Sequence, residues 1–472
     1  MDWEKQYQDC LQYIDSYWSK IILKPARFRM GKRIIQRVVM KSRNHDYHII
    51  EVPYTCLVPN DSKYRYIFYW DSYFMFRGLL QTDRAWVIPE MVENFVYIFR
   101  KYQIIPNFSH PESLGRSHAP FLSSMILDAY TVLQHDHKLS SSIRRVLLRP
   151  QTKKHWLQTR MEIAKQEYHI VWESPMDVDH QHYNHKVVDY ELNRYGDRDV
   201  GYGQHAEQES GWDMTSRFYN RCHEFLPIDL NCFLYTYERD FAKVSDMLED
   251  AVEKRYWEKR AHDRIERINR YMWNDTEGFF YDYDYIHKKQ SQFLSLAGFV
   301  PMWAGIATAE QAKRMVEKLP VFKTPFGLAI SDKASLPPPV DLGTLAEPYR
   351  ITLEEVLKPE QWDYPNIWPP LHYLVVVGLL RYGYRDTAQE LMEQYLATNA
   401  QAFRKHHAML EKMDGLTGDK PPTYWYPTQL GFGWTNAIFY RYIQILKSLE
   451  TMQSIYKEPK PHQPPYELAI LH

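Results

Sequence analysis

The stretch that decides the fold of this chain is Gln361-Trp362-Asp363-Tyr364-Pro365-Asn366-Ile367-Trp368-Pro369-Pro370. Proline removes a backbone donor and restricts the residue before it, so the segment predicts a rigid loop rather than a strand or a helix interior. Two indoles beside a carboxylate suit a sugar, because the rings stack on C–H surfaces and the carboxylate accepts hydroxyl protons. A proline-rich turn whose tryptophans close the edge of the core is the structural alternative.

Helical periodicity dominates the chain after about residue 75. Apolar residues recur at three- and four-residue intervals in segments 84–102, 120–133, 230–271, 309–319, 371–380, 385–405 and 435–448. Loops rich in Trp, Tyr, Gly, Pro and Asn separate these segments, and the best strand candidates are 47–52 and 278–285. The alternation predicts an all-α fold, an (α/α)6 toroid of helical hairpins whose loops build a site at one end.

The domain organisation follows from the absence of a long Pro/Gly/Ser linker in the helical region. Residues 66–472 are expected to form one (α/α)6 domain, and residues 1–65 a short N-terminal extension that packs on it. The segment 335–360 contains three consecutive prolines and is expected to be a surface excursion near the site.

Composition excludes several classes of partner. There are 58 Lys and Arg against 59 Asp and Glu, so no basic excess supports a nucleic acid or an anionic membrane as partner. The 37 Tyr and 14 Trp suit a cleft for neutral hydroxylated ligands. Cys10, Cys56, Cys222 and Cys232 have no metal-ligand spacing and predict reduced, buried thiols. A polar N-terminus and the lack of a long apolar run predict a soluble cytoplasmic protein. The sequence indicates no oligomeric state.

Four further motifs place charged side chains beside tryptophan, glycine or proline. They are Tyr69-Trp70-Asp71-Ser72-Tyr73-Phe74, Asn107 followed by Gly115-Arg116-Ser117-His118-Ala119-Pro120, Glu209-Ser210-Gly211-Trp212-Asp213, and Glu411-Lys412-Met413-Asp414 with the later Gly431-Phe432-Gly433-Trp434-Thr435-Asn436. Each has a structural alternative: an Asp can cap a helix N-terminus, an Arg can cap helix carbonyls, and a Glu can be a solvated charge.

The Asp213 motif has a physical reason to hold a proton donor. Gly211 lets the loop approach a ligand, and Trp212 shields the neighbouring carboxyl from water. Desolvation raises the pKa of a carboxyl, so that it stays protonated and can donate.

In this order, the five motifs resemble the signatures of the trehalases and related inverting α-glycosidases, including the glucosylglycerate and mannosylglycerate hydrolases. The resemblance covers most of the chain after residue 65. It implies that Asp213 is the general acid and Glu411 the general base, with no metal ion and no organic cofactor. The sugar-binding residues expected with it are Trp70, Asp71, Asn107, Arg116, Arg194, Trp212, Gln361, Trp362, Asp363, Trp425 and Trp434.

Two carboxyl groups on opposite sides of a glycosidic bond suit hydrolysis with inversion. The resemblance therefore implies an inverting α-glycosidase acting on a small soluble α-glucoside, with α,α-trehalose as the first choice. A glucosylglycerate, mannosylglycerate or other α-glucoside hydrolase of the same fold is the second. A sugar-binding protein without catalysis is the third.

The chain departs from the family pattern in segments that bear on the leaving group. Lys63 or Arg65 stands near the place of a family arginine, and His118 replaces a usual Gln. Trp425 stands where trehalases carry a second, substrate-binding Glu. An Arg-Pro-Glu segment is absent, and Arg194 lies in its region.

A metal site and another class of α-toroid protein are the alternatives to this interpretation. His180, His182 and His185 could converge on a metal ion, but so polar a loop is more often solvated. Terpenoid cyclases and prenyltransferases share the α-toroid, but they need an Asp-rich cation or diphosphate motif that the sequence lacks.

Overall fold

The computed structural model describes residues 2–30, 33–37, 49–135, 150–174, 185–198, 204–335, 360–423 and 426–455. The helices in these ranges are α1 (Trp3–Gln6), α2 (Gln8–Ile21), α3 (Tyr69–Leu79), α4 (Val87–Tyr102), α5 (Leu122–Gln134), α7 (Pro150–Glu167), α8 (Gln204–Ser210), α9 (Ile228–Met247), α10 (Ala251–Met272), α11 (Val300–Ala304), α12 (Ala309–Lys318), α14 (Pro369–Arg381), α15 (Arg385–His406) and α16 (Gly433–Ile455).

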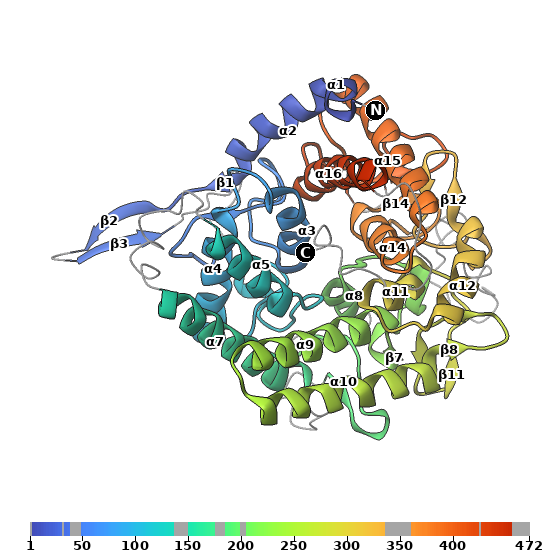
Figure 1. Ribbon diagram of the computed structural model, residues 1–472, viewed down its shortest axis with the longest axis horizontal. Helices are drawn as coiled ribbons and strands as arrows, with labels where there is room; N and C mark the ends of the chain where they lie inside the picture. The colour runs from blue at the N-terminus through green and yellow to red at the C-terminus, as the bar shows by residue number, and fades with distance from the viewer. Residues whose placement is uncertain are drawn as a thin grey trace, which may run out of the picture.

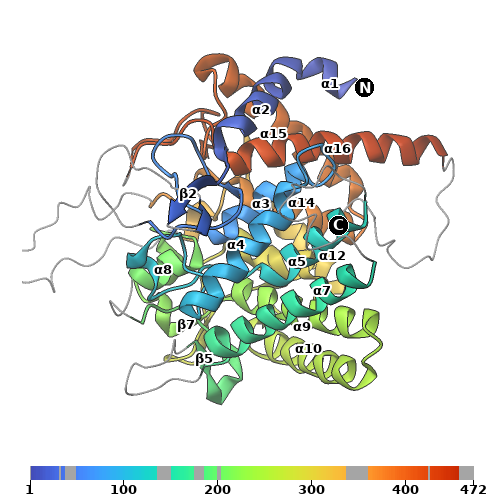
Figure 2. The ribbon, with the colours of Figure 1, turned by 90° about the vertical axis from the view of Figure 1, so that its left-hand side faces the viewer.

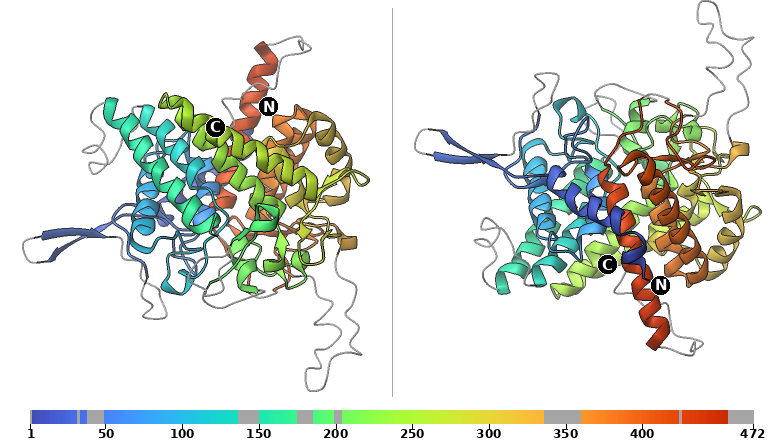
Figure 3. Two further views of the ribbon diagram at one scale, coloured as in Figure 1. Left: turned by 90° about the horizontal axis from the view of Figure 1, so that it is seen from below. Right: turned by 90° about the horizontal axis from the view of Figure 1, so that it is seen from above.

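The strands are short and pair antiparallel. The pairs are β1 (Ile22–Leu23) with β4 (Cys56–Leu57), β2 (Ala26–Met30) with β3 (Arg33–Arg37), β5 (Lys186–Val187) with β6 (Leu192–Asn193), β7 (Phe225–Leu226) with β10 (Tyr283–Asp284), β10 with β11 (Lys289–Gln290), β8 (Trp273–Asn274) with β9 (Phe279–Phe280), β12 (Lys323–Thr324) with β13 (Gly327–Leu328), and β14 (Asn366–Ile367) with β15 (Met413–Asp414). They connect the helices, apart from the β2–β3 hairpin, which projects from the body (Figures 1 and 3).

The helices form a closed ring around a central axis (Figure 1). On its inner side α5 packs on α9, α9 on α11, α11 on α14, α14 on α16, and α16 on α3. Helices α4, α7, α10 and α15 pack on this inner set from outside. This ring confirms the predicted all-α toroid.

Burial separates the inner helices from the outer ones. Helix α14 is buried at every position from Pro369 to Leu380, whereas α10 buries one stripe of five residues in 22. A helix that is apolar on all sides belongs inside a domain, and an amphipathic helix covers its surface. The prolines Pro369 and Pro370 also start α14, because the first turn of a helix needs no donor at those positions.

The ring closes between α3 and α16, the first and last helices of its inner set. An added Cβ on Gly78 of α3 would come within 2.4 Å of the Cα of Ala437 in α16. On the outside of this contact, α2 packs on α16, and the Trp3 Nε1 donates to the Glu450 Oε1 at 3.0 Å.

Most predicted helices appear with ends shifted by a few residues. The segment 230–271 is the exception, because it forms two antiparallel helices. The chain turns after α9, and the Asp250 side chain accepts from the backbone N–H groups of Val252 and Glu253 to start α10. Helices α1, α2, α7, α8 and α11 lie outside the segments predicted to be helical.

Several other sequence predictions have mixed outcomes. The segment 278–285 contains β9 and β10, and all four cysteines are free and buried as expected. Helix α2 and residues 50–58 contribute to the same core as the ring, and the boundary at residue 65 stays a prediction. Residues 47–48 and 336–359 lie outside the described ranges. Within those ranges, no helix has the length and apolar character needed to cross a membrane.

The two ends of the ring differ. Viewed from the side, α8, β5 and β7 lie at one end, while the C-terminal half of α16 extends beyond the other (Figure 2). Segments that lead into the inner helices α3, α5, α14 and α16 contribute residues to a common pocket, described next.

Candidate active site

Five segments far apart in the sequence surround a pocket of about 450 Å³. Most of the residues expected to bind sugar or catalyse its hydrolysis meet there. The pocket is lined by Pro59, Lys63, Tyr64, Tyr66, Phe68, Trp70, Asp71, Asn107, Phe108, Arg116, His118, Gln208, Gly211, Asp213, Trp362, Trp368, Glu411, Tyr426, Phe432 and Trp434.

Asp213 reaches the pocket from the loop that follows α8. Gly211 in this loop has a φ of 80°, and an added Cβ there would lie 2.7 Å from the ring of Trp70. Only glycine therefore allows the loop to cross Trp70 this closely. Burial, with a smaller effect of the charge on Glu411, raises the pKa of Asp213 to about 6.

Glu411 reaches the pocket from the loop between α15 and α16 and has three hydrogen-bond donors around its carboxylate. The Tyr426 hydroxyl donates to Oε1 at 3.0 Å, and Lys412 Nζ and the backbone N–H of Gln429 donate to Oε2 at 3.2 Å each. Trp434 Nε1 also donates to the Glu411 carbonyl at 2.9 Å. Donors of this kind stabilise an ionised carboxylate.

The segment 360–368 touches both carboxyl-bearing loops. The Gln361 Nε2 donates to the Asp213 carbonyl at 2.6 Å, and the Trp362 N–H donates to the Met214 carbonyl at 3.1 Å. On the other side, β14 pairs with β15, with Asn366 opposite Asp414. This segment thus fixes the Asp213 loop and the Glu411 loop relative to each other.

Asp363 lies outside the pocket lining, and its side chain contacts the loop that carries Asp213. Its carboxylate accepts from Thr215 Oγ1 at 3.1 Å and from Ser216 N and Oγ at 2.9 and 2.6 Å. Gln361 also lies outside the lining. The sequence predicted both as sugar ligands, but their side-chain hydrogen bonds join protein loops.

Tryptophans pack against one another along one wall. Trp362 stacks on Trp368 with ring centroids 3.7 Å apart and an interplanar angle of 4°. Trp70 lies 5.8 Å from Trp362, and Trp434 lies 5.9 Å from Trp368. Trp212 is fully buried behind Trp362 and does not line the pocket.

Asp71 and His118 lie on the side of the pocket formed by the start of α3 and the segment before α5. Burial and the charges of Glu411 and Asp213 raise the pKa of Asp71 well above its usual range. Burial, with the positive charge of Arg116, lowers the pKa of His118 well below its usual range. His118 is therefore a neutral imidazole, and its ring lies 5.2 Å from Trp70.

Asn107 and Arg116 line the pocket and also hold neighbouring loops. Asn107 Nδ2 donates to the Gln208 carbonyl at 2.7 Å, and Arg116 Nη1 contacts the Asp197 Oδ2 at 3.0 Å. Gln208 belongs to α8, so the first contact joins the segment before α5 to the helix that precedes Asp213, and the second joins it to the segment 185–198.

Arg194, which was expected to bind sugar, lies outside the pocket lining. Its Nη1 donates to the His223 carbonyl at 2.8 Å and to the Tyr285 hydroxyl at 2.9 Å. The absent Arg-Pro-Glu segment suggested a replacement here, but the side chain contacts a different loop.

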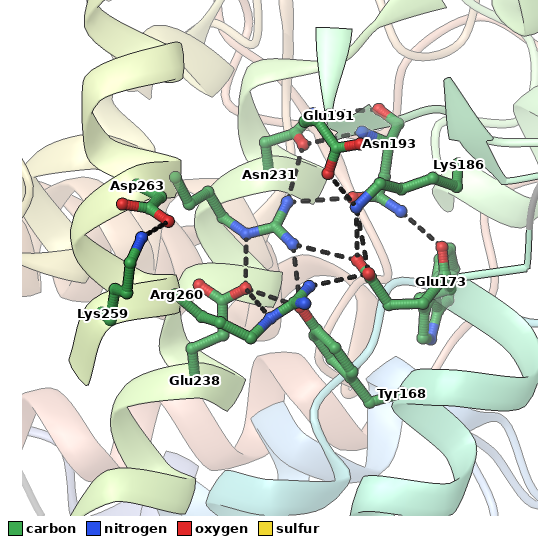
Figure 4. A network of polar contacts seen from close by, with 12 residues as sticks. Tyr168, Glu173, Lys186, Glu191, Asn193, Asn231, Glu238, Lys259, Arg260 and Asp263 are labelled. Atoms are coloured by element: carbon green, nitrogen blue, oxygen red, sulfur yellow. Dashed lines mark hydrogen bonds and ion pairs between the residues drawn. The ribbon is translucent and has the colours of Figure 1, made fainter. Parts of the chain in front are cut away.

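A buried polar network fastens the segment 185–198 to α9 and α10 (Figure 4). Lys186 Nζ contacts Glu173 at 3.0 Å, and Arg264 Nη1 of α10 donates to the Asn193 Oδ1 at 2.9 Å. Asn231 of α9 accepts from the Asn193 N–H at 3.0 Å. The network holds the segment that carries Asp197, the partner of Arg116.

The remaining predicted residues are Trp425 and the three histidines of the candidate metal site. Trp425, His180 and His182 lie outside the described residues. His185 is buried, and its Nε2 lies 2.7 Å from the Glu209 Oε2. Among the described residues, no group of three or more His, Cys, Asp or Glu side chains could hold a metal ion.

Three aromatic residues of the pocket lining and two residues beside Glu411 were not predicted from the sequence. Tyr64, Tyr66 and Phe68 line the pocket from the segment that leads into α3, and their spacing in the sequence is the signal that could have revealed them. Tyr426 was passed over for its neighbour Trp425. Lys412 was treated only as part of a motif.

Comparison with known proteins identifies the family of the chain. The sequence profile of the family described as Trehalase matches residues 16–448. The chain belongs to the trehalase family. It is a trehalase-family glycoside hydrolase, and its substrate is a sugar.

Solved structures show the same fold. The neutral trehalase of Saccharomyces cerevisiae is 25% identical with a TM-score of 0.69, and the match covers 94% of this chain and 81% of that one. A family 63 mannosylglycerate hydrolase from Thermus thermophilus, in complex with glucose, is 16% identical with a TM-score of 0.53 over 81% of this chain and 95% of that one. At 16% identity, the match to the mannosylglycerate hydrolase shows only a shared fold.

Proposed function

We propose that this protein hydrolyses α,α-trehalose to glucose with inversion at the anomeric carbon, using Asp213 as general acid and Glu411 as general base. The observation that carries the proposal is the contrast between two carboxyl groups in one pocket. Asp213 has a pKa raised to about 6 by burial, and Glu411 is surrounded by three donors. Environments that differ in this way assign one carboxyl to proton donation and the other to proton removal.

The proposed reaction is a single displacement. Asp213 transfers its proton to the glycosidic oxygen, and the bond from that oxygen to the anomeric carbon breaks. Glu411 takes a proton from a water molecule whose oxygen attacks the same carbon from the opposite face. Inverting enzymes keep roughly 6.5–9.5 Å between such carboxyl groups to admit this water.

Residues of the pocket wall provide the proposed site for the glucosyl ring that is attacked. Trp70 and Trp362 line the pocket and can contact the C–H surface of the sugar, and Asn107 and Arg116 can donate to its hydroxyl oxygens. Asp71 can accept a hydroxyl proton when ionised or donate when protonated. These residues are therefore proposed to select the glucosyl ring that is attacked, and not the leaving group.

A second candidate is an α-glucoside with an anionic leaving group, such as a glycerate. Lys63 is exposed at the pocket, and its Nζ lies 4.8 Å from the centre of the Tyr426 ring and 5.1 Å from that of Tyr64. An ammonium group so placed can bind a carboxylate. This observation favours a charged leaving group over a second glucose.

Incubation with trehalose, glucosylglycerate, mannosylglycerate and kojibiose distinguishes the candidates. NMR of the first product identifies the released sugar and its anomer. We expect trehalose to have the highest kcat/KM and to release one β-glucose, because inversion converts the α-linkage. A higher kcat/KM for a glycerate glycoside would establish the second candidate.

Two outcomes would contradict the mechanism. Retention of the α-configuration would exclude a single displacement. Binding of these sugars without turnover by the wild type would indicate a sugar-binding protein.

A further inference from the structure

Lys412 occupies an unusual position for a lysine, because it is only 1% exposed. Its Nζ lies 3.2 Å from the Glu411 Oε2 and 3.3 Å from the Gln361 Oε1. The same nitrogen lies 4.1 Å from the centre of the Tyr426 ring and 4.8 Å from that of Trp368. A carboxylate, an amide oxygen and two ring faces therefore surround one buried cation.

Gln361 extends this contact to the other carboxyl-bearing loop. Its Oε1 accepts from Lys412, while its Nε2 donates to the Asp213 carbonyl at 2.6 Å. The Gln361 carbonyl accepts from Trp368 Nε1 at 2.8 Å, which limits movement of the residue. One amide thus joins the lysine beside Glu411 to the main chain of Asp213.

We propose that Lys412 and Gln361 are positioning residues of the reaction. Lys412 holds the Glu411 carboxylate ionised and correctly oriented, and Gln361 fixes Lys412 relative to Asp213. This inference rests on the proposed function, because it assigns Glu411 to proton removal and Asp213 to proton donation.

The contacts from Glu411 through Lys412 and Gln361 to the Asp213 carbonyl form a bridge between the two carboxyl-bearing loops. The charges around this bridge determine the effect of removing Lys412. Glu411, Asp213 and Lys63 act on it electrostatically. The Glu411 charge in turn affects Asp71, Tyr64 and Tyr426. Burial lowers the pKa of Lys412, opposed by Glu411 and Asp213. Loss of this cation removes the positive charge 3.2 Å from the Glu411 Oε2 and raises the pKa of Asp213, which the cation lowers.

The first test compares the pH profiles of Lys412→Met and Lys412→Arg with the wild type. The substrate is the α-glucoside of the panel with the highest wild-type kcat/KM. For Lys412→Met we expect the low-pH limb to move upward by about one pH unit, because a nearby opposite charge typically shifts a carboxyl pKa by 1–3 units. The high-pH limb, set by Asp213, moves in the same direction.

The same variants separate charge from shape. We expect kcat of Lys412→Met to fall about 10–100-fold at the wild-type optimum with KM changed less than about threefold, since the lost contact acts on the reacting groups. Lys412→Arg keeps the cation and should restore the low-pH limb. Lys259→Met, an exposed lysine paired with Asp263 on α10, is the matched control and should leave both limbs unchanged.

The second test divides the bridge at Gln361. Gln361→Glu keeps an acceptor for Lys412 but cannot donate to the Asp213 carbonyl when ionised, and Gln361→Met removes both contacts. We expect kcat to fall in both variants, and the low-pH limb to move upward most in Gln361→Glu, because its added negative charge opposes ionisation of Glu411. An unchanged kcat in both would overturn the role of Gln361.

A double-mutant cycle tests the contact without any substrate. Lys412→Met should lower the melting temperature in the wild-type background and lower it much less in Glu411→Gln, since the ion pair is then already absent. Equal losses in both backgrounds, or limbs of Lys412→Met that coincide with those of the wild type, would overturn the proposal. Lack of wild-type turnover with a positive cycle would refute the proposed function and leave the ion pair established.

Discussion

The surroundings of Asp213 and Glu411 differ although both carboxyls belong to one pocket. Among the described residues, no side chain donates a hydrogen bond to the Asp213 carboxyl, whereas Tyr426 and Lys412 donate to Glu411. Gln361 contacts both regions, but at Asp213 it reaches only the main chain. The fold thus withholds side-chain donors from one carboxyl and supplies them to the other, which is how identical chemical groups acquire opposite tasks.

The largest effect is expected from removing either carboxyl. Asp213→Asn and Glu411→Gln should each lower kcat on trehalose about 10²–10⁴-fold, the usual contribution of general acid or base catalysis. α-Glucosyl fluoride distinguishes them, because fluoride leaves without protonation. We expect Asp213→Asn to retain most wild-type activity on the fluoride and Glu411→Gln to retain little. Equal losses on both substrates would remove the distinction between the two environments.

The pH dependence of kcat/KM should report the raised pKa of Asp213. The acid must be protonated, so activity on trehalose should fall about tenfold per pH unit above roughly pH 6. With α-glucosyl fluoride the same limb should be absent, since no proton is donated. A high-pH limb that is identical for the two substrates would assign the titration to another group.

A smaller effect is expected from removing one donor at Glu411. Tyr426→Phe should lower kcat/KM by about tenfold at the optimum, because a hydrogen bond to a charged group contributes about 1.5–3 kcal/mol. It should also move the low-pH limb upward, since the ionised carboxylate loses support. Tyr256→Phe, at an exposed tyrosine of α10, is the matched control. A wild-type profile for Tyr426→Phe would show that this donor is dispensable.

The smallest expected effect concerns stability. A carboxyl whose pKa is higher in the folded than in the unfolded state lowers stability as pH rises from about 4 to about 6. Asp213→Asn removes this cost, so it should raise the free energy of unfolding by about 1 kcal/mol more at pH 7.5 than at pH 4. The figure is smaller than the full pKa shift would give, because the Asp213 side chain is partly exposed. Urea denaturation at both pH values measures the difference. Equal effects at the two pH values would contradict the raised pKa.

Much of the fold was predictable because helical periodicity is a local signal. Helices α4, α5, α12, α14 and α15 have repeating apolar positions within one segment. Helix α7 has many polar residues and a weak pattern, so only its packing in the ring identifies it. The split between α9 and α10 depends on one Asp cap inside a continuous apolar pattern.

The site was predictable in part, for the same reason. Trp70, Asp213 and Glu411 belong to motifs whose order along the chain brings them to one pocket. Asp363 belongs to such a motif as well, yet its carboxylate binds Thr215 and Ser216, which are far away in the sequence. A motif can indicate that a carboxylate belongs to a segment near the pocket, but tertiary contacts decide whether that side chain faces the ligand or the protein.

The contact between Gly78 and Ala437 has a consequence for how the chain is made. The two helices that close the ring are separated by more than 350 residues, so α3 leaves the ribosome long before its partner exists. Until α16 emerges, the fully buried surface of α3 has no cover, and such surfaces are prone to aggregation. The ring therefore depends on its last helix, and a nascent chain that stops before residue 433 carries an open seam along its inner wall.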